Sequence, residues 1–548
     1  MAVRSEQRLD SRVAGLEAIL REEPVRIPEG EKQKIIEELR KVASPERVRD
    51  EPHILASYPG PAFEITSKGI KYRLPDIVVY PKSREEVKGI LMIASKYKIP
   101  ITVACLQSTM LASSPLKGGI LLDLMNFNQI LKVDTEHSYV VVEPGVRISQ
   151  LKERIGPGYA IAKGSYYTSF SVVSTLVAGL AVHNFTNRMW DQVIGLEMVM
   201  PDGSILYTGT MAYGDCEHWT EVNRGFSQIK NLFIPNHATI GVITKAAIRI
   251  WPLLDKLVVP IFGFDDFESA FRWAHAMSKS SMVDQAMVWL WPMAGRIEYN
   301  QQTGAYLDFM EARMNCYQDE MPKGVDLFNC FAWVQMRGYK EEIEGALKTA
   351  KRLARQYGGK YITKERFPNL WRYWTSLMEE RGGEFDSGFG EGESAYSEFW
   401  TPTPEERGEV GAVEAPLSIP FTGTVDELIK LYRGLTEKLK EFGYKNWNAY
   451  SRMFHSGQTP WLRFICLVEA ETREEVQKSM RLREEITRYA LNNYNVTSYV
   501  GGPLNDPENP EHFIGRGEPI HRLISAVRRE FDPEGIMTPV MKKYTLLS

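Results

Sequence analysis

Residues 75–101 read PDIVVYPKSREEVKGILMIASKYKIPI, and this stretch decides the fold. The β-branched run after Pro75 and the run that starts at Ile99 are typical of buried strands. Between them, Ser83 is placed to cap a helix, with Glu86 three residues later in a capping box. Strand, helix and strand in this order predict an α/β unit.

The sequence on either side of this unit extends the same domain. Before it, the segments 13–21 and 29–42 are predicted helices, separated and ended by prolines. After it, short apolar strands continue to about residue 254, with a helix expected at 148–156. The triplet at 201–203, Pro-Asp-Gly between two alternating apolar runs, predicts a hairpin turn.

The C-terminal half repeats a pattern of strand followed by helix. This pattern predicts an α+β sheet domain with helices on one face. The pairs are 256–266 with a helix from 267, 417–421 with 425–442, and 461–469 with 473–492. A Gly- and Glu-rich segment at 381–399 is predicted to be a mobile or partner-contacting loop.

The composition excludes several classes of protein. The chain has 548 residues, 43% hydrophobic and 25% charged, which is ordinary for a globular protein with a packed core. A net charge of −4 without a basic stripe argues against nucleic acid as a partner. No apolar run is long enough to span a membrane or to form a secretory signal, so we expect a cytoplasmic protein. The five cysteines and nine histidines lack metal-ligand spacing, so no metal site is expected.

Six segments, taken in order, carry a resemblance to a known family. They are residues 75–101, GGILLDLMNFNQILKVD at 118–134, YVVVEPGV at 139–146, VIGLEMVMPDGSIL at 193–206, ATIGVITKAAIRIWP at 238–252 and RREFDPEGIMTP at 528–539. Together they resemble the FAD-linked oxidases of the vanillyl alcohol oxidase and p-cresol methylhydroxylase (PCMH) superfamily.

The resemblance implies an α+β fold: a PCMH-type FAD-binding domain of two subdomains, followed by an α+β cap domain for the substrate. The implied parts are an N-terminal helical segment (1–55), the FAD-binding domain (56–254), the cap domain (255–510) and a C-terminal segment that returns to the FAD domain (511–548).

In this family a glycine-rich loop grips the FAD pyrophosphate with its main-chain N–H groups. The matching stretch here, residues 104–115, has no glycine. If the loop kept its shape, side chains would occupy left-handed backbone positions at about 1–2 kcal/mol each. The hydroxyls of Ser108 and Thr109, with Gln107, are the groups left to bind phosphate.

Other cofactor contacts implied by the resemblance lie farther along the chain. They are Gly164, Ser165, Ala178, Gly179, Ile240 and Val242. Many relatives tether the flavin through a histidine in the first loop, but here Cys105 stands nearby instead. We therefore expect FAD to be bound non-covalently.

Three residues are candidates for catalysis. Tyr499 matches the tyrosine that stabilises a phenolate in this family, although Val500 stands where the relatives have an arginine. Arg188 falls near the flavin, where it would hold a carboxylate or stabilise reduced flavin, or would be a solvated surface charge. His455 is a candidate base, or a structural hydrogen-bonding residue.

The expected function is a FAD-dependent dehydrogenase or oxidase that moves a hydride from a small hydroxylated or aromatic substrate to flavin N5. The resemblance also implies a homo-oligomer, with an electron-transfer protein or a larger complex as a further partner. The alternative is a family member that has lost FAD and serves as a non-catalytic structural subunit. The glycine-free first loop favours that alternative.

Overall fold

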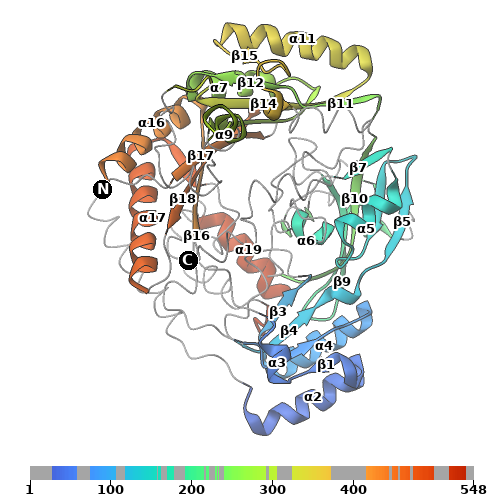
Figure 1. The fold of residues 1–548 in the computed structure, drawn as a ribbon. Helices are drawn as coiled ribbons and strands as arrows, with labels where there is room; N and C mark the ends of the chain where they lie inside the picture. The colour runs from blue at the N-terminus through green and yellow to red at the C-terminus, as the bar shows by residue number, and fades with distance from the viewer. Residues whose placement is uncertain are drawn as a thin grey trace.

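A computed structural model describes most of the chain. The described residues are 27–58, 74–106, 118–156, 158–161, 170–177, 192–214, 218–220, 229–230, 232–233, 240–252, 254–291, 295–304, 324–371, 415–442, 447–454, 457–468, 473–498 and 518–537. Within them, three sheets follow one another along the chain (Figure 1).

The first sheet is small and mainly parallel. Its strands are β1 (Val48–Arg49), β2 (Ile77–Val79), β3 (Ile101–Ala104) and β4 (Ile120–Asp123), in the order β1-β2-β4-β3. β4 is parallel to β2 and β3, and β1 is antiparallel to β2. Helices α2 (Glu29–Ala43) and α4 (Arg84–Tyr97) pack against it, and the short helix α3 (Pro52–Leu55) precedes β2. Since parallel strands need a crossover, α4 connects β2 to β3.

The second sheet is antiparallel and holds much of the apolar core. Its strands are β5 (Ile130–Asp134), β6 (Tyr139–Val142), β7 (Tyr159–Ile161), β8 (Val193–Val199), β9 (Ile205–Tyr207) and β10 (Val242–Pro252). The order is β5-β6-β10-β8-β9, and β7 also pairs with β10. Helices α5 (Ile148–Ile155) and α6 (Val172–Val177) and the 3-10 turns η3 (Leu124–Asn126) and η5 (Gly209–Tyr213) accompany it.

The third sheet has nine strands and forms the upper body of Figure 1. They are β11 (Lys256–Val258), β12 (Ile261–Phe264), β13 (Val283–Leu290), β14 (Cys330–Gly338), β15 (Lys360–Tyr361), β16 (Ala415–Gly423), β17 (Trp447–Phe454), β18 (Thr459–Val468) and β19 (Val496–Ser498). The order is β15-β12-β14-β13-β17-β18-β16-β19, with β11 beside β14, and all pairs are antiparallel.

Each face of the third sheet has its own core, because side chains alternate along a strand. Helices α7 (Phe267–Met277), α11 (Lys340–Gln356), α16 (Val425–Glu441) and α17 (Arg473–Asn493) cover the outer face. The short helices α9 (Arg296–Thr303) and α12 (Pro368–Trp371) pack together at one end. The inner face shares a single apolar cluster with the second sheet, which fixes the two sheets against each other.

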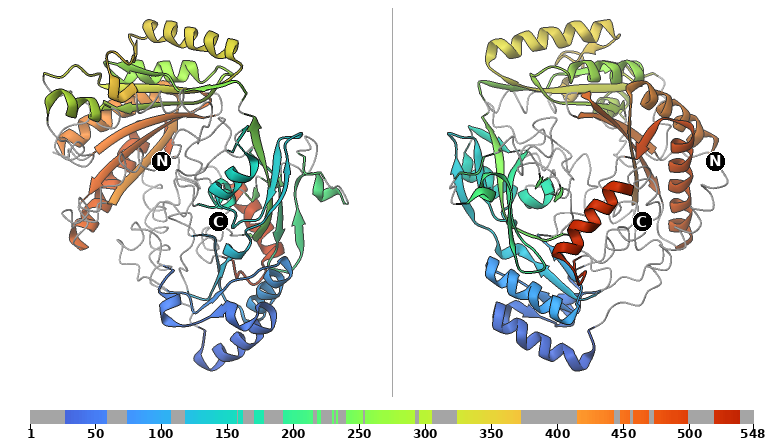
Figure 2. Two further views of the ribbon diagram at one scale, coloured as in Figure 1. Left: turned by 45° about the vertical axis from the view of Figure 1, so that its right-hand side comes forward. Right: turned by 180° about the vertical axis from the view of Figure 1, so that it is seen from behind.

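The C-terminal helix α19 (Glu518–Phe531) returns to the first sheet, as the right-hand view of Figure 2 shows. Ile101 N donates to Ile536 O at 2.7 Å, and Met537 forms a parallel bridge with Ile101. Asp532 accepts the main-chain N–H groups of Ile536 and Met537, at 2.8 and 3.0 Å. The turn that follows α19 therefore joins the last described residues to β3.

Most of the secondary structure expected from the sequence is present. The helix at 29–42, the helix at 148–156, the hairpin at 201–203 and the three strand–helix pairs of the C-terminal half are confirmed. Gly203 has the left-handed φ of 81° that this hairpin turn requires. The helix expected at 13–21 and the loop at 381–399 lie outside the described residues.

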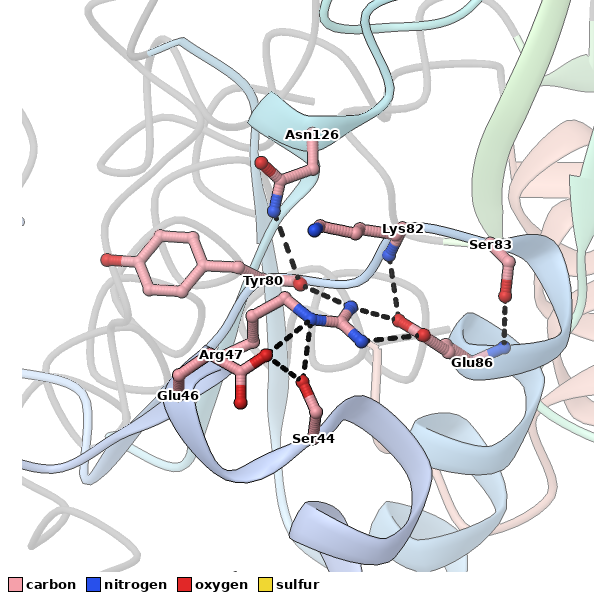
Figure 3. A network of polar contacts seen from close by, with 8 residues as sticks. All are labelled: Ser44, Glu46, Arg47, Tyr80, Lys82, Ser83, Glu86 and Asn126. Atoms are coloured by element: carbon pink, nitrogen blue, oxygen red, sulfur yellow. Dashed lines mark hydrogen bonds and ion pairs between the residues drawn. The ribbon is translucent and has the colours of Figure 1, made fainter.

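The capping box at α4 is only half formed. Ser83 accepts from Glu86 N at 3.2 Å, as predicted. The Glu86 carboxylate, however, accepts from Lys82 N at 2.8 Å and pairs with both terminal nitrogens of Arg47 (Figure 3). A guanidinium is a stronger donor than a main-chain N–H, so Arg47 draws the carboxylate away from the cap.

Candidate functional site

Two segments predicted to contact the cofactor are held together at one carbonyl group. Cys105, just after β3, donates from Sγ to Pro144 O at 3.1 Å. Ser171, just before α6, donates from Oγ to the same oxygen and accepts from Ser174 N at 2.9 Å. The end of β3 and the start of α6 therefore meet at one point between the first and second sheets.

The predicted phosphate loop is bounded by left-handed backbone on both sides. Leu106 has a φ of 52°, and Gly118 and Gly119 have φ of 76° and 83°. A Cβ on Gly119 would lie 2.3 Å from Pro100 O, so only glycine fits there. Leu106 places a branched side chain in a left-handed backbone conformation, which matches the strain expected for this loop.

A buried acid lies at the same edge of the first sheet. Asp123 ends β4, opposite Ala104 at the end of β3, and is 4% exposed. It accepts from the Tyr58 hydroxyl at 2.7 Å and from Met125 N at 2.9 Å. The Tyr58 oxygen is 3.0 Å from that of Tyr80. Burial raises the pKa of Asp123 and that of Tyr58 above their ordinary values.

The ion-pair network of Figure 3 fixes the strand that carries Tyr80. Arg47, from the turn before β1, donates to Tyr80 O at 3.2 Å while it holds Glu86. Asn126, from η3, donates to the same carbonyl at 3.4 Å. The N-terminal helical segment thus braces the carboxyl edge of the first sheet, where ligands of open parallel sheets bind.

Two predicted cofactor residues, Ile240 and Val242, are packed inside the protein. Both are almost fully buried, at 3% and 0% exposed. Between them, a Cβ on Gly241 would lie 2.9 Å from Met200 Sδ. Their side chains are therefore core residues, and any contact with a cofactor would come from their main chain.

The other predicted site residues lie outside the described residues, so their roles stay predictions. They are Gln107, Ser108, Thr109, Gly164, Ser165, Ala178, Gly179, Arg188, His455 and Tyr499.

The inner face of the third sheet carries a set of aromatic and cationic side chains that we call the inner wall. It consists of Trp289, Trp333, Tyr450, Arg452, Trp461 and Arg463. All except Arg463 are at most 6% exposed. Four of them belong to the cluster shared with the second sheet, so the wall faces the part of the molecule that carries the predicted cofactor segments.

Strand register arranges the wall in two rows. In one row Trp289 is opposite Tyr450, and Tyr450 is opposite Arg463. In the other, Arg452 is opposite Trp461. The pairing of β13, β14, β17 and β18 thus brings residues from four segments of the sequence to one face of the sheet.

The cations of the wall contact its aromatic rings. Arg463 donates to the Tyr450 hydroxyl at 2.7 Å. The Arg452 guanidinium lies 5.5 Å from the Tyr450 ring centroid and 5.6 Å from that of Trp461. Such cation–π contacts keep a guanidinium in place at a buried surface. The wall therefore combines aromatic rings and guanidinium groups on one largely buried face of the sheet.

The sequence reasoning missed this wall. Strand β18 was expected, but β13, β14 and β17 were not singled out. The signal was present as alternation: Trp289 and Trp291 in one segment, Phe331 and Trp333 in another, and Tyr450 and Arg452 in a third. Alternation alone does not show which face is inward.

The fold defines a class of protein. Residues 75–209 match the family model described as FAD binding domain. The chain as a whole has the two-domain PCMH-type fold that its sequence predicted.

Relatives of known name share part of the chain. A probable mitochondrial D-lactate dehydrogenase of Danio rerio is 29% identical over 205 residues, which are 36% of this chain and 39% of the relative. The glycolate oxidase subunit GlcD of Bacillus subtilis is 27% identical, over 33% of this chain and 37% of its own length. The match thus spans about two fifths of the length of these relatives.

Solved structures match almost the whole chain. The 4-ethylphenol oxidase of Gulosibacter chungangensis superposes with a TM-score of 0.72 and 18% identity, covering 94% of this chain and 98% of the oxidase. A p-cresol methylhydroxylase gives the same TM-score and identity, covering 96% and 99%. At this identity the likeness establishes the fold.

Two searches of the described residues gave no candidate. None of their helices is long and apolar enough to cross a membrane. Nor does that part of the chain gather three or more His, Cys, Asp or Glu side chains in a way that could hold a metal ion.

Proposed function

We propose that this protein is a FAD-dependent oxidoreductase that takes a hydride from a small hydroxylated or aromatic substrate. The domain match at 75–209 and the dehydrogenases and oxidases among its relatives support the reaction class. The observation that carries the substrate side is the inner wall, which places three tryptophans, one tyrosine and two arginines on the face turned toward the FAD-binding domain.

The described residues fit a bound FAD at the junction of the first and second sheets. The carboxyl edge of β3 and β4 opens there, and the loops at 107–117 and 162–169 start or end there. Gln107, Ser108 and Thr109 would hold the pyrophosphate with side-chain donors in place of glycine N–H groups. Bound FAD would accept the hydride at its N5 atom.

The cofactor would be held without a covalent bond to Cys105. The thiol of Cys105 is buried and donates to Pro144 O. Burial raises the pKa of this thiol to about 12, so the reactive thiolate is scarce near neutral pH. A thiol in this state is a poor nucleophile toward the flavin ring.

The inner wall would orient the substrate. Trp289, Trp333 and Trp461, buried in the cluster shared with the second sheet, would pack against the ring or alkyl chain of a substrate held between the two sheets. The guanidinium groups of Arg452 and Arg463 would stabilise negative charge on a hydroxyl or acid group of the substrate. Tyr499, Arg188 and His455 remain our candidates for direct contact with the reacting atoms.

The alternative of a non-catalytic subunit without FAD has no support in the comparisons. One relative is the flavoprotein subunit of the 4-cresol dehydrogenase of Pseudomonas putida, 24% identical over 42% of this chain and 44% of its own length. On that likeness we propose an electron-transfer partner or an oligomer for this protein too, and a cytoplasmic location as its sequence suggests.

An absorption spectrum of the purified protein, taken after reconstitution with FAD, tests the proposal. Bound flavin gives two bands in the near-ultraviolet and blue. Their absence from the protein fraction after gel filtration would contradict FAD binding. If the bands are present, anaerobic bleaching by 2-hydroxy acids and by para-alkylphenols, added separately, identifies the substrate class.

A further inference from the structure

Three parts of the molecule meet where the chain passes from the second sheet to the third. Arg337, at the end of β14, donates from Nη1 to Pro252 O at 2.7 Å, at the end of β10. Its Nε donates to Asp284 Oδ2 at 3.0 Å, on β13. Its guanidinium lies 5.4 Å from the ring centroid of Trp251. One side chain therefore contacts both sheets at their junction.

Trp251 continues this chain of contacts toward the cofactor domain. Its indole N–H donates to Gln192 Oε1 at 2.8 Å. Gln192 is fully buried and comes directly after residues 178–191, where Gly179 and Arg188 are predicted to contact the flavin. The next residue, Val193, pairs with Ile248 in the second sheet, so this end of the segment is fixed.

Arg337 also belongs to the strand that carries part of the inner wall. Every second side chain of a strand points to the same side, so Trp333, Gln335 and Arg337 lie on one face of β14. Gln335 is 1% exposed, and its Nε2 has no hydrogen-bond partner among the residues that the structure describes. A buried amide without a hydrogen-bond partner costs free energy. Such a group is typical of a surface where a ligand or a water molecule supplies the missing hydrogen bond.

We propose that Arg337 is a positioning residue, which holds the inner wall at a fixed place relative to the cofactor segment that ends at Gln192. The inference rests on the proposed function, because that function makes the two surfaces the substrate side and the flavin side of one site. Arg337 itself contacts neither substrate nor cofactor. Its effect passes through Trp251 and Pro252.

Asp284 makes this positioning sensitive to pH. Its carboxyl is 7% exposed, and burial raises its pKa to about 6, against the opposing effect of Arg337. Below that pH the carboxyl is neutral, so the ion pair with Arg337 becomes a hydrogen bond from the guanidinium to an uncharged acid.

Other charged groups surround this position. Arg249 of β10 lies 5.5 Å from the Trp251 ring, and Lys256 of β11 is opposite Gly338. Asp255 accepts from Lys340 N at 3.3 Å, and Glu342 of α11 accepts from Tyr339 N at 2.9 Å. Among these groups, Arg337 is the one that bonds to Asp284.

The test compares Arg337→Gln, Arg337→Lys and Asp284→Asn with the wild type and with Asp326→Asn. The last variant breaks another Arg–Asp pair of the same domain, Arg366–Asp326, whose acid is 70% exposed. Two readouts are used from pH 5 to 8. One is the visible circular dichroism of bound FAD, and the other is hydrogen exchange in peptides covering 192–199 and 249–258 of the protein without FAD.

Arg337→Gln is expected to speed exchange in both peptides roughly tenfold and to change the flavin dichroism. Arg337→Lys is expected to restore part of each signal. The hydrogen-exchange rates of the wild type are expected to change near pH 6. Asp284→Asn is expected to lack this change. Asp326→Asn is expected to match the wild type throughout.

Wild-type exchange rates and pH dependence in Arg337→Gln would overturn the inference. If Arg337→Gln does not fold, wild-type behaviour of both Arg337→Lys and Asp284→Asn would overturn it equally. If the wild type binds no FAD, the proposed function fails, while the exchange measurement still reports on the junction. The two failures are therefore distinguishable.

Discussion

Cys105 Sγ and Ser171 Oγ donate to one acceptor, the main-chain oxygen of Pro144. This shared acceptor joins the end of β3 to the start of α6, although strands β4 to β7 lie between them in the sequence. The two elements that it joins flank the segments predicted to contact the cofactor. The arrangement depends on short polar side chains, since the phosphate loop has no glycine of its own.

Ser171→Ala should weaken this junction. The substitution removes the bond to Pro144 O and the acceptor for Ser174 N in a fully buried place, at a cost of about 1–3 kcal/mol. Urea denaturation should show the loss, and a FAD titration should show weaker binding. Ser204→Ala, which removes a hydroxyl from an exposed turn, is the matched control and should change neither. Equal behaviour of the two variants would contradict the assignment.

Cys105 should resist alkylation in the folded protein. Because burial raises its thiol pKa to about 12, iodoacetamide at pH 8 should label Cys105 only after denaturation. Peptide mass spectrometry before and after unfolding measures this. Any FAD should also be released by acid precipitation, and a flavin that stays on the peptide containing Cys105 would show the expectation to be wrong.

Tyr450→Phe should weaken binding of an aromatic anion. The variant keeps the ring but removes the acceptor for Arg463, and a bond from a charged donor is worth about 1.5–3 kcal/mol. Titration with benzoate, followed by the flavin spectrum, should give a dissociation constant raised about tenfold. Tyr489→Phe, which removes a hydroxyl contact on the helix-covered side of the same sheet, should leave it unchanged.

Asp284 should make the folded protein less stable as pH rises. Its pKa is about 6 when folded and near 3.8 when unfolded, so the stabilisation is full below pH 4 and is lost as pH rises through about 6. The difference is about 2–3 kcal/mol. In Asp284→Asn the free energy of unfolding should not fall by this amount between pH 4 and 7. A variant that keeps the wild-type slope would refute the expectation.

Lys98→Gly should stabilise the protein. Lys98 caps the C-terminus of α4 with a left-handed φ of 55°, and its side chain is 74% exposed. Glycine adopts this conformation without the steric penalty, so a gain of about 1 kcal/mol is expected, less a small loss from the exposed pair with Glu534. Lys98→Ala keeps a Cβ and should bring no gain. Thermal melting of both variants decides the matter.

Sequence reasoning succeeded where structure is local. The strand–helix–strand at 75–101, the hairpin at 201–203 and the helices after β12, β16 and β18 depend on caps, turns and periodicity, which neighbouring residues determine. The capping box at Glu86 was wrong in one half, because Arg47 comes from a different element and competes for the carboxylate.

The fold class was predictable from the sequence, because six ordered segments resemble a known family and that resemblance implied the fold. The inner wall was decided only by tertiary structure. Trp289 and Tyr450 become neighbours because β13 pairs with β17, which is far away in the sequence, and Arg337 reaches Pro252 only when two sheets meet. Local patterns set the period of a strand, while register and sheet packing decide which of its faces is turned inward.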